Sequence, residues 1–519
     1  MTEYIPTIGL EIHANVKTET KMFCSCTNDL TEREPNKNTC PICLAHPGTL
    51  PTANREAIRK VIRLGLAVGG TIAEHSHFDR KSYFYPDLPK GYQISQYEEP
   101  LVTGGELEGV RITRVHLEED AGRLAHVARP NGERMGTNDE RIFDKNSVQF
   151  DTHSSVGVSL VDFNRAGVPL LELVTEPDMH DGVHAVRFAK SLQRILKYLG
   201  VSDADMEEGQ MRVEVNISLG KGLGSYEGAK KLTYGTKVEV KNLNSFRAVQ
   251  GAIDYEIKRQ GKLLEDGEII VQETRGWNDE KGITESQRGK EDAHDYRYFP
   301  EPDLPPLNLA EWGIDELRAE LPELPAAKRK RFVEEFAVTP DQADGLTDDR
   351  AFAEYFEAAA SEFKERLSAS ADPSADKPGA SYASLVNYLL SDLRGLMGQR
   401  KLLLADLKVS PEHFGHFASL VSSGKLSSRL AKNLLLKMAE TGEDPETLIR
   451  KSGVEVVSDV VALEAVAKEI VAANPKPAAD YRAGKLSTLQ FFLGQGMAKT
   501  KGQADPAKLR EAIEKTLSS

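Results

Sequence analysis

Three consecutive carboxylates, Glu118, Glu119 and Asp120, close a segment that otherwise has the pattern of a β-strand. Carboxylates this close together repel one another, and a divalent cation is the simplest group that offsets the repulsion in a cleft. Mg²⁺ takes oxygen ligands and commonly holds a substrate phosphate as well. A solvated acidic turn explains the same run equally well, so other segments must decide between the two.

A second strand-like segment carries groups of the same kind. Along residues 8–16 apolar and polar side chains alternate, and Glu11 and His13 fall on the polar face. Glu172 stands inside an apolar strand, where an unpaired carboxylate is costly unless it is neutralised or meets a cation. A metal ion satisfies Glu172, and so does a salt bridge to Arg165, so both remain open from the residues alone.

Alternation also restricts the acidic run itself. In residues 110–119, His116 and Glu118 share one face of the strand, while Glu119 lies on the other with Leu117. Glu118 and Glu119 cannot both bind one ion while the strand stays regular. Only one of them is therefore expected to be a metal ligand.

Two later segments repeat the arrangement of an apolar back and an ionic front. Residues 211–217 place Arg212 and Glu214 on one face, and residues 236–242 place lysine and glutamate opposite valine. Such strands predict a sheet with its core on one face and a cradle for an ionic ligand on the other. Carboxylates that hold Mg²⁺, with lysine and arginine nearby, suit phosphoryl transfer. Because no G-x-x-x-x-G-K-[ST] loop occurs, we expect this sheet to hold any ATP.

The 4 cysteines form two close pairs in one short segment of the chain. Two pairs separated by a loop are what a tetrahedral structural zinc needs, and no open coordination position would remain for catalysis. Disulfides are the rival interpretation, which a reducing compartment disfavours. The predicted zinc ligands are Cys24, Cys26, Cys40 and Cys43.

Length and composition indicate a globular protein of several domains. The chain has 519 residues, more than one hydrophobic core usually supports. Its net charge of −14 argues against non-specific nucleic-acid binding by the whole surface but is compatible with a local basic face. No apolar run approaches membrane-spanning length, and the first residues lack the layout of a signal peptide. We therefore expect a cytoplasmic protein with no membrane association.

The predicted fold class is α+β, with a mostly antiparallel sheet followed by helices. The composition changes after Pro306, where apolar residues take up helical spacing. Ser410 followed by Pro411 predicts the start of a further helix. The predicted domains are a catalytic cradle with the zinc site (1–295), a helical middle domain (296–405) and a helical tail domain (406–519).

The segment from Val161 to Asp178 reads VDFNRAGVPLLELVTEPD. It resembles, nearly position for position, the signature of the B subunit of the glutamyl/aspartyl-tRNA amidotransferases. The resemblance is dense over residues 1–310 and thinner beyond. Other landmarks of the same family are residues 9–13, 78–96, 116–122, 206–209, 241–246 and 295–303.

The resemblance implies a catalytic domain of the glutamine-synthetase class of fold. It also implies a C–N ligase with glutamine as amide donor, in which Mg²⁺ and ATP phosphorylate the side-chain carboxylate of Glu or Asp misacylated onto tRNA(Gln) or tRNA(Asn). Ammonia then displaces the phosphate. The residues carried over from the family are Glu11, His13, Glu119 and Glu172 as magnesium ligands, Glu208 and Lys81 as further catalytic residues, and Arg212, Glu214 and Glu118 as residues that contact the nucleotide.

The chain itself shows no source of ammonia. Its cysteines are committed to the zinc site, and no amidase signature with a Ser–Ser–Lys set occurs. In the family, which forms a heterotrimer, ammonia comes from a separate amidase subunit through an internal tunnel, a small third subunit wraps around the pair, and a C-terminal module binds tRNA. The cations of the tail that could meet phosphates are Lys425, Arg429, Lys432, Lys485, Lys499 and Lys501.

Two other functions remain open. A free-standing carboxylate–amine ligase on a small metabolite predicts amidation without tRNA, and the long helical C-terminal third argues against it. A non-catalytic adaptor that holds tRNA for a partner predicts that Glu11→Ala or Glu119→Ala leaves amidation intact. The ionic strand faces argue against the adaptor.

Overall fold

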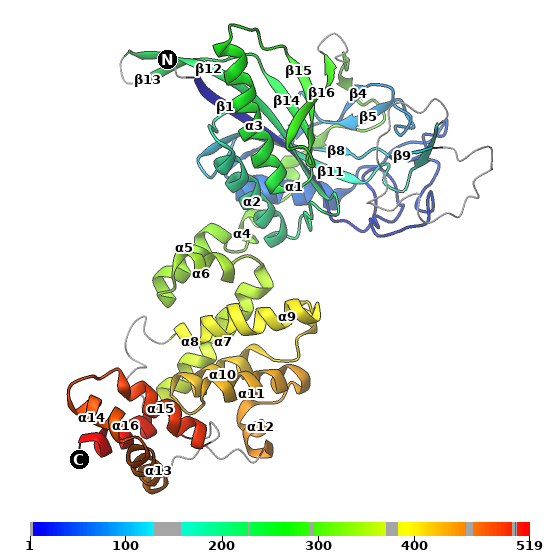
Figure 1. The fold of residues 1–519 in the computed structure, drawn as a ribbon. Helices are drawn as coiled ribbons and strands as arrows, with labels where there is room; N and C mark the ends of the chain where they lie inside the picture. Colours follow the sequence, from blue (N-terminus) through cyan, green and yellow to red (C-terminus); the bar gives the residue numbers. More distant parts are fainter. Residues whose placement is uncertain are drawn as a thin grey trace. The chain divides into compact units, whose positions relative to one another are not determined.

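The computed structural model describes residues 4–128, 157–226, 229–289, 295–369, 382–452, 460–500, 504 and 506–518. The chain divides into two compact units, residues 1–324 and 325–519, drawn in Figure 1. Strands dominate the first unit and the second is helical, which confirms the α+β class. Among the described residues, no helix combines the length and the apolar character needed to span a bilayer.

The first strand occupies the middle of the main sheet, whose order is β16-β15-β14-β12-β1-β11-β8-β6-β2. Neighbouring strands are antiparallel except β14 and β15, which run parallel. The bounds are β1 (Tyr4–Asn15), β2 (Thr71–Ile72), β6 (Val102–Thr103), β7 (Glu106–Leu107), β8 (Val110–Glu119), β11 (Pro169–Thr175), β12 (Met211–Tyr226), β13 (Ala229–Thr233), β14 (Val238–Leu243), β15 (Glu273–Asn278) and β16 (Ile283–Gly289).

Three helices cover one face of this sheet: α1 (Arg55–Ala67), α2 (Gly182–Tyr198) and α3 (Phe246–Glu265) (Figure 1). Each begins at a polar N-cap; for α1 the Asn54 side chain accepts hydrogen bonds from two backbone N–H groups of the first turn. Their apolar sides join a single hydrophobic core with the inward side chains of the strands, such as Leu10. Because side chains alternate along a strand, the polar groups must lie on the opposite face.

Shorter strands pack beside the main sheet. They are β3 (His75–Ser76), β4 (Asp79–Ser82), β5 (Tyr92–Ser95), β9 (Arg123–Ala128), β10 (Gly157–Asp162), β17 (Phe299–Pro300) and β18 (Leu307–Asn308). They pair as β17-β4-β5, β18-β3 and β10-β9.

The segment 296–324 belongs to the first unit, which differs from the predicted domain boundary at 295/296. β17 and β18 pair with β4 and β3, and the side chain of Arg80 forms an ion pair with Glu301 at 2.7 Å. Leu317, in α4 (Ile314–Ala319), joins the hydrophobic core of the first unit, after the short helix η3 (Leu309–Glu311). The change in composition at Pro306 thus lies inside the unit, because strand pairing over long sequence separations holds the segment there.

The second unit contains two hydrophobic clusters of described residues, one from Phe332 to Leu448 and one from Leu463 to Leu517. The predicted boundary at 405/406 falls within the first cluster, where the Tyr355 hydroxyl donates to the carbonyl of Val409. The helices are α5 (Pro325–Phe336), α6 (Pro340–Leu346), α7 (Arg350–Ala369), α8 (Ala383–Asn387), the π-helical η4 (Tyr388–Leu393), α9 (Arg394–Arg400), η5 (Leu404–Asp406), α10 (Pro411–Ser422), α11 (Ser428–Thr441), α12 (Pro445–Ser452), α13 (Val460–Ala473), α14 (Pro475–Arg482), α15 (Thr488–Lys499) and α16 (Pro506–Ser518).

Candidate active site

Three neighbouring strands bring His13, Glu118 and Glu172 together on the ionic face of the main sheet. His13 on β1 lies opposite Glu172 on β11, and Glu172 lies opposite His116 on β8. The Nε2 atom of His13 is 3.6 Å from a Glu172 oxygen and 3.7 Å from a Glu118 oxygen. His116 Nε2 is 3.2 Å from the same Glu172 oxygen. The partners of Glu172 are therefore histidines rather than Arg165.

The charges within this cluster stabilise the protonated form of His13 and the ionised form of Glu172. Burial would lower the pKa of His13, but the hydrogen bond and charge of Glu172 and the charge of Glu118 raise it to about 9. Burial would likewise raise the pKa of Glu172, but His116 and His13 hold it well below its usual range. One ligand atom from each of His13, Glu118 and Glu172 lies within 4.8 Å of the other two, so the set fits one metal ion.

A second carboxylate cluster lies next to the first on the same face. Glu11 and Glu214 are register partners on β1 and β12, and ligand atoms of Glu11, Glu214 and Glu239 lie within 4.8 Å of one another. The Lys241 ammonium is 2.6 Å from Glu214 and 3.3 Å from Glu239. Burial and the charges of Glu172 and Glu214 raise the pKa of Glu11. The arrangement fits a second cation site, which sequence reasoning did not separate from the first.

Glu119 does not join the carboxylates with which it was predicted to bind magnesium. It lies on the opposite face of β8, where its oxygens accept hydrogen bonds from the Lys90 ammonium (2.7 Å) and the Ile94 backbone N–H (3.0 Å). Glu118 takes the place beside His13 and also accepts from the Ser95 hydroxyl. The reason is the strand alternation: consecutive residues cannot face the same ion.

Asp120 binds two arginines at the end of β8. Its carboxylate is 2.7 Å from Arg165 and 3.2 Å from Arg212, and the Asn15 amide donates to it at 3.1 Å. Although burial would raise the pKa of Asp120, the two guanidinium groups hold it well below its usual range. Arg212 is the register partner of His13, so this ion-pair network borders the metal-binding cluster.

Lys81 interacts electrostatically with Glu118 and Glu172 of the first cluster, whereas Glu208 lies apart from the cluster. Burial would lower the pKa of Lys81, but the charges of Glu118, Tyr298 and Glu172 raise it, so the amine is a stable cation there. Its ammonium lies 5.0 Å from the centre of the Tyr296 ring. Glu208 is exposed in the loop before β12 and lines a separate cavity of about 350 Å³.

The four predicted zinc ligands come together, with one ligand atom of each within 4.8 Å of the others. The Sγ atoms of Cys40 and Cys43 are 3.9 Å apart, close to the roughly 3.8 Å that two thiolates on one tetrahedral zinc adopt. The hydrogen bond from Cys24 and the charge of Lys21 lower the pKa of Cys43 to about 5 against the effect of burial, whereas burial raises that of Cys26 to about 11. The donor set therefore fits a structural zinc.

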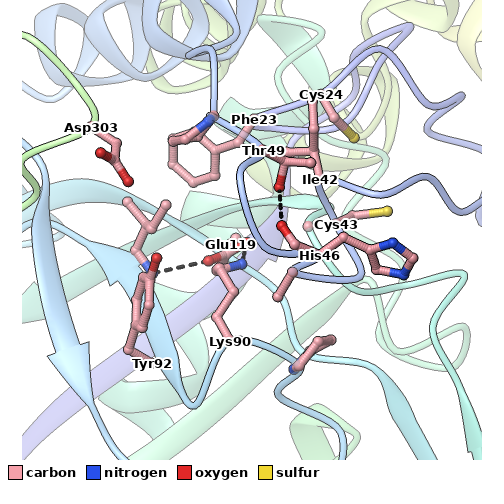
Figure 2. Close-up of a pocket in the computed structure, with 15 residues that line it drawn as sticks. Phe23, Cys24, Ile42, Cys43, His46, Thr49, Lys90, Tyr92, Glu119 and Asp303 are labelled. Atoms are coloured by element: carbon pink, nitrogen blue, oxygen red, sulfur yellow. Dashed lines mark hydrogen bonds and ion pairs between the residues drawn. The ribbon is translucent and has the colours of Figure 1, made fainter.

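A cavity of about 190 Å³ separates the cysteines from Glu119 (Figure 2). The side chains of Cys24 and Cys43 lie on one side of it, and Tyr92 and Asp303 on the other. Lys90 and Glu119 form their ion pair in its wall. The cavity thus has both polar and apolar side chains in its lining and lies between the cysteine segment and the back of β8.

Several residues that contact the predicted site residues were not themselves predicted from the sequence. Lys21 is fully buried, and its ammonium donates to the carbonyls of Asn38 (2.6 Å) and Phe163 (3.3 Å) and lies 3.9 Å from Cys43 Sγ. Lys90, the partner of Glu119, carried no recognisable spacing signal. His116 had one, because it shares the alternating face of Glu118.

The predicted phosphate contacts of the tail are only partly available. Lys432 pairs with Asp392 and Lys499 with Glu469, whereas Lys425, Arg429 and Lys485 are exposed. Lys501 lies outside the described residues.

Comparison with known proteins finds relatives that match nearly the whole length of the chain. Residues 6–315 match the family described as the GatB/GatE catalytic domain, and residues 374–517 match the GatB domain. The chain is 42% identical to the B subunit of the aspartyl/glutamyl-tRNA(Asn/Gln) amidotransferase of Rippkaea orientalis, over 99% of this chain and 98% of that protein. It belongs to the GatB family.

Two further B subunits of the same amidotransferase show the same extent of similarity. Identity is 41% with that of Thermoanaerobacter pseudethanolicus (99% of this chain, 100% of that protein) and 43% with that of Thermomicrobium roseum (99% of each). The resemblance seen in the sequence is thereby confirmed. The catalytic-domain match includes both carboxylate clusters and the cysteine cluster, and the GatB-domain match extends over parts of both hydrophobic clusters of the helical unit of this GatB-family chain.

Proposed function

We propose that this chain is the part of an aspartyl/glutamyl-tRNA amidotransferase that activates the misacylated amino acid and converts it to the amide. The similarity to amidotransferase B subunits over 99% of the chain carries the proposal. The ionic face of the main sheet supplies the groups that such chemistry requires.

The proposed reaction has two steps. A carboxylate oxygen of Glu or Asp esterified to tRNA attacks the γ-phosphorus of ATP, which forms an acyl phosphate and releases ADP. Ammonia then attacks the acyl carbon, loses a proton and expels inorganic phosphate, so that the side-chain amide remains. Neither step needs a nucleophile from the protein, and positioning and charge neutralisation provide the acceleration.

The residues of the two carboxylate clusters have distinct roles in this scheme. His13, Glu118 and Glu172 would hold one magnesium ion, and Glu11, Glu214 and Glu239 a second. Bound Mg²⁺ supplies neutralisation of the phosphate charge. Lys81, which the charges of Glu118 and Glu172 hold as a cation, would contact the transferred phosphoryl group. Arg212, whose guanidinium is held by Asp120, would contact the nucleotide.

The ammonia is proposed to come from a partner. The chain has 4 cysteines, and all of them lie in the cluster that fits zinc, which leaves no thiol for a glutaminase. We propose a separate amidase subunit as the source and a small third subunit that completes a heterotrimer. Four cysteines grouped as zinc ligands rather than as disulfides are in keeping with a cytoplasmic location.

The helical C-terminal part is proposed to bind the tRNA. Lys425, Arg429 and Lys485 present exposed cations, and the overall charge of −14 confines such contacts to local surfaces. In this proposal the three predicted domains remain the functional regions of the chain, although its two compact units divide between residues 324 and 325.

Amidation of misacylated tRNA tests the proposal. The assay uses ATP, Glu-tRNA(Gln) or Asp-tRNA(Asn), and either the amidase partner with glutamine or ammonium chloride alone. We expect tRNA-dependent ATP hydrolysis and amide formation, both reduced at least about 100-fold by Glu118→Gln, since the variant removes one of the three ligands. Glu285→Gln, an exposed carboxylate on β16, serves as the matched control.

The same assay distinguishes the two alternative functions, because each of them predicts a different result. Amidation of free glutamate at an equal rate without tRNA would favour the metabolite ligase. Full amidation by Glu118→Gln and Glu172→Gln would favour the adaptor. Either result would contradict the proposed function.

A further inference from the structure

Two tyrosines and an arginine that the proposed reaction does not use lie together beside the ionic face. Tyr97 follows β5 and Tyr298 precedes β17, and their rings are stacked, with centroids 4.4 Å apart and an interplanar angle of 10°. The Arg114 guanidinium lies 5.8 Å from the centre of the Tyr97 ring. Three segments distant in the sequence thus meet at one place.

Arg114 lies near several carboxylates but is not paired with any carboxylate that the structure describes. It alternates onto the same face of β8 as His116 and Glu118. Within the part of the chain that the structure describes, it forms no ion pair, and its buried Nε atom has no hydrogen-bond partner. The planar fork of a guanidinium matches the oxygens of a phosphate, so a phosphate is a suitable partner for this side chain.

The tyrosine pair has the properties of a stacking platform. Tyr97 is 52% exposed, although its backbone N–H is fixed by a 2.7 Å hydrogen bond to the fully buried carboxylate of Asp79. Tyr298 is supported in turn by the Tyr296 ring, with centroids 6.0 Å apart. A rigid, exposed aromatic ring beside a cation binds nucleobases by stacking, with little loss of side-chain entropy.

The platform lies next to the first carboxylate cluster. Ser95, two residues before Tyr97, donates to Glu118 at 3.2 Å. Burial raises the pKa of Tyr298 to about 12, with Lys81 lowering it and the charges of Glu118 and Glu172 raising it further. A nucleotide on the platform would therefore have its phosphate side close to the groups that fit magnesium.

We propose that Tyr97 and Tyr298 stack the base of a nucleotide and that Arg114 binds a phosphate of the same nucleotide. The inference rests on the proposed function, because ATP and the 3′ end of tRNA both present an adenosine with an adjacent phosphate. The shared chemistry is an adenine ring with a flanking phosphate, and the experiment must identify which substrate provides it.

Binding measurements on the full-length chain test the platform. Tyr97→Ala is expected to weaken binding of the nucleotide by about tenfold, whereas Tyr97→Phe, which keeps the ring, should bind like the wild type. The matched control is Tyr234→Ala, because Tyr234 is also an exposed tyrosine (67%) and lies before β14. Inorganic tripolyphosphate has no base, so its binding should be weakened by Arg114→Gln and unaffected by Tyr97→Ala.

Two arms of the binding experiment identify which substrate, ATP or tRNA, provides the adenosine. One measures a non-hydrolysable ATP analogue with Mg²⁺, and the other compares tRNA with and without its terminal adenosine. Loss of affinity for the analogue in Tyr97→Ala assigns the platform to ATP, and loss of the preference for the intact 3′ end assigns it to tRNA. If Tyr97→Ala matches Tyr234→Ala in both arms, the inference is overturned even when the wild type amidates tRNA. Failure of the wild type to amidate would instead overturn the proposed function.

Discussion

Binding of Mg²⁺ at His13, Glu118 and Glu172 is expected to release one proton near neutral pH. His13 lies between two carboxylates, at 3.7 and 3.6 Å, and its pKa is raised to about 9. At pH 7, about one metal-free molecule in a hundred therefore carries a neutral imidazole. A metal ligand must be the neutral ring, so the ion has to displace the proton.

Competition between the proton and Mg²⁺ for His13 sets the size and the sign of the pH dependence of Mg²⁺ binding. The apparent affinity for Mg²⁺ should increase about tenfold per pH unit between about pH 7 and 9 and level off above. In the metal-free protein the free energy of unfolding changes in the opposite direction, because it decreases as the pH rises. Because the folded pKa of His13 lies above its ordinary value of 6.5, the protonated ring contributes about 3 kcal/mol below pH 6.5, and this contribution is lost as the pH rises through 9.

Calorimetric titration with Mg²⁺ in two buffers of different ionisation enthalpy counts the released protons. His13→Gln should release none and bind independently of pH, and Glu118→Gln should bind more weakly and release fewer, because His13 loses a carboxylate partner. Glu119→Gln is the matched control, since Glu119 faces the other side of β8. Binding without proton release in the wild type would refute the displacement. A greater loss in Glu119→Gln than in Glu118→Gln would refute the ligand assignment.

Three further changes test other parts of the structure. Asp120→Asn leaves two arginines without their shared charged partner and should lower the free energy of unfolding in urea by about 1–3 kcal/mol, because both arginine side chains are partly exposed and water screens them. An unchanged midpoint would contradict a stabilising role of this ion-pair network. Lys21→Met removes a cation 3.9 Å from Cys43 Sγ and should weaken zinc binding about tenfold or more in competition with a chromogenic chelator, an effect absent if the lysine only fills space. A chain that ends at residue 452 keeps the first hydrophobic cluster of the helical unit intact and lacks the second. It should bind ATP normally but tRNA more weakly. Equal tRNA affinity would show that the last helices are dispensable for tRNA binding.

The strand faces were predictable because side chains alternate with a fixed period of two. The pattern alone placed Glu11 and His13 on one face of β1 and Arg212 and Glu214 on one face of β12, and the structure has them there. The prediction of Glu119 as a ligand came from the family resemblance, whereas the alternation with His116 puts Glu118 on the face where the structure groups it with His13 and Glu172. The cysteine spacing likewise predicted the cluster that the structure shows.

The remaining features depend on pairings between distant segments, which periodicity does not encode. Glu239 joins Glu11 only because β14 pairs with β12. Arg165 binds Asp120, whereas the sequence left it as a possible partner of Glu172. Residues 296–324 were assigned to the helical domain because local composition carries no signal of strand pairing with β3 and β4.

The central position of β1 has a consequence for biosynthesis. This strand is synthesised before both of its neighbours in the sheet, β11 and β12, which follow more than a hundred residues later in the chain. Until then the nascent chain exposes an apolar strand with two open edges, the type of surface that recruits holding chaperones and invites misassembly. Pausing of translation between residues 15 and 169 should accordingly increase aggregation, whereas a pause after residue 226 should be harmless to this sheet's centre.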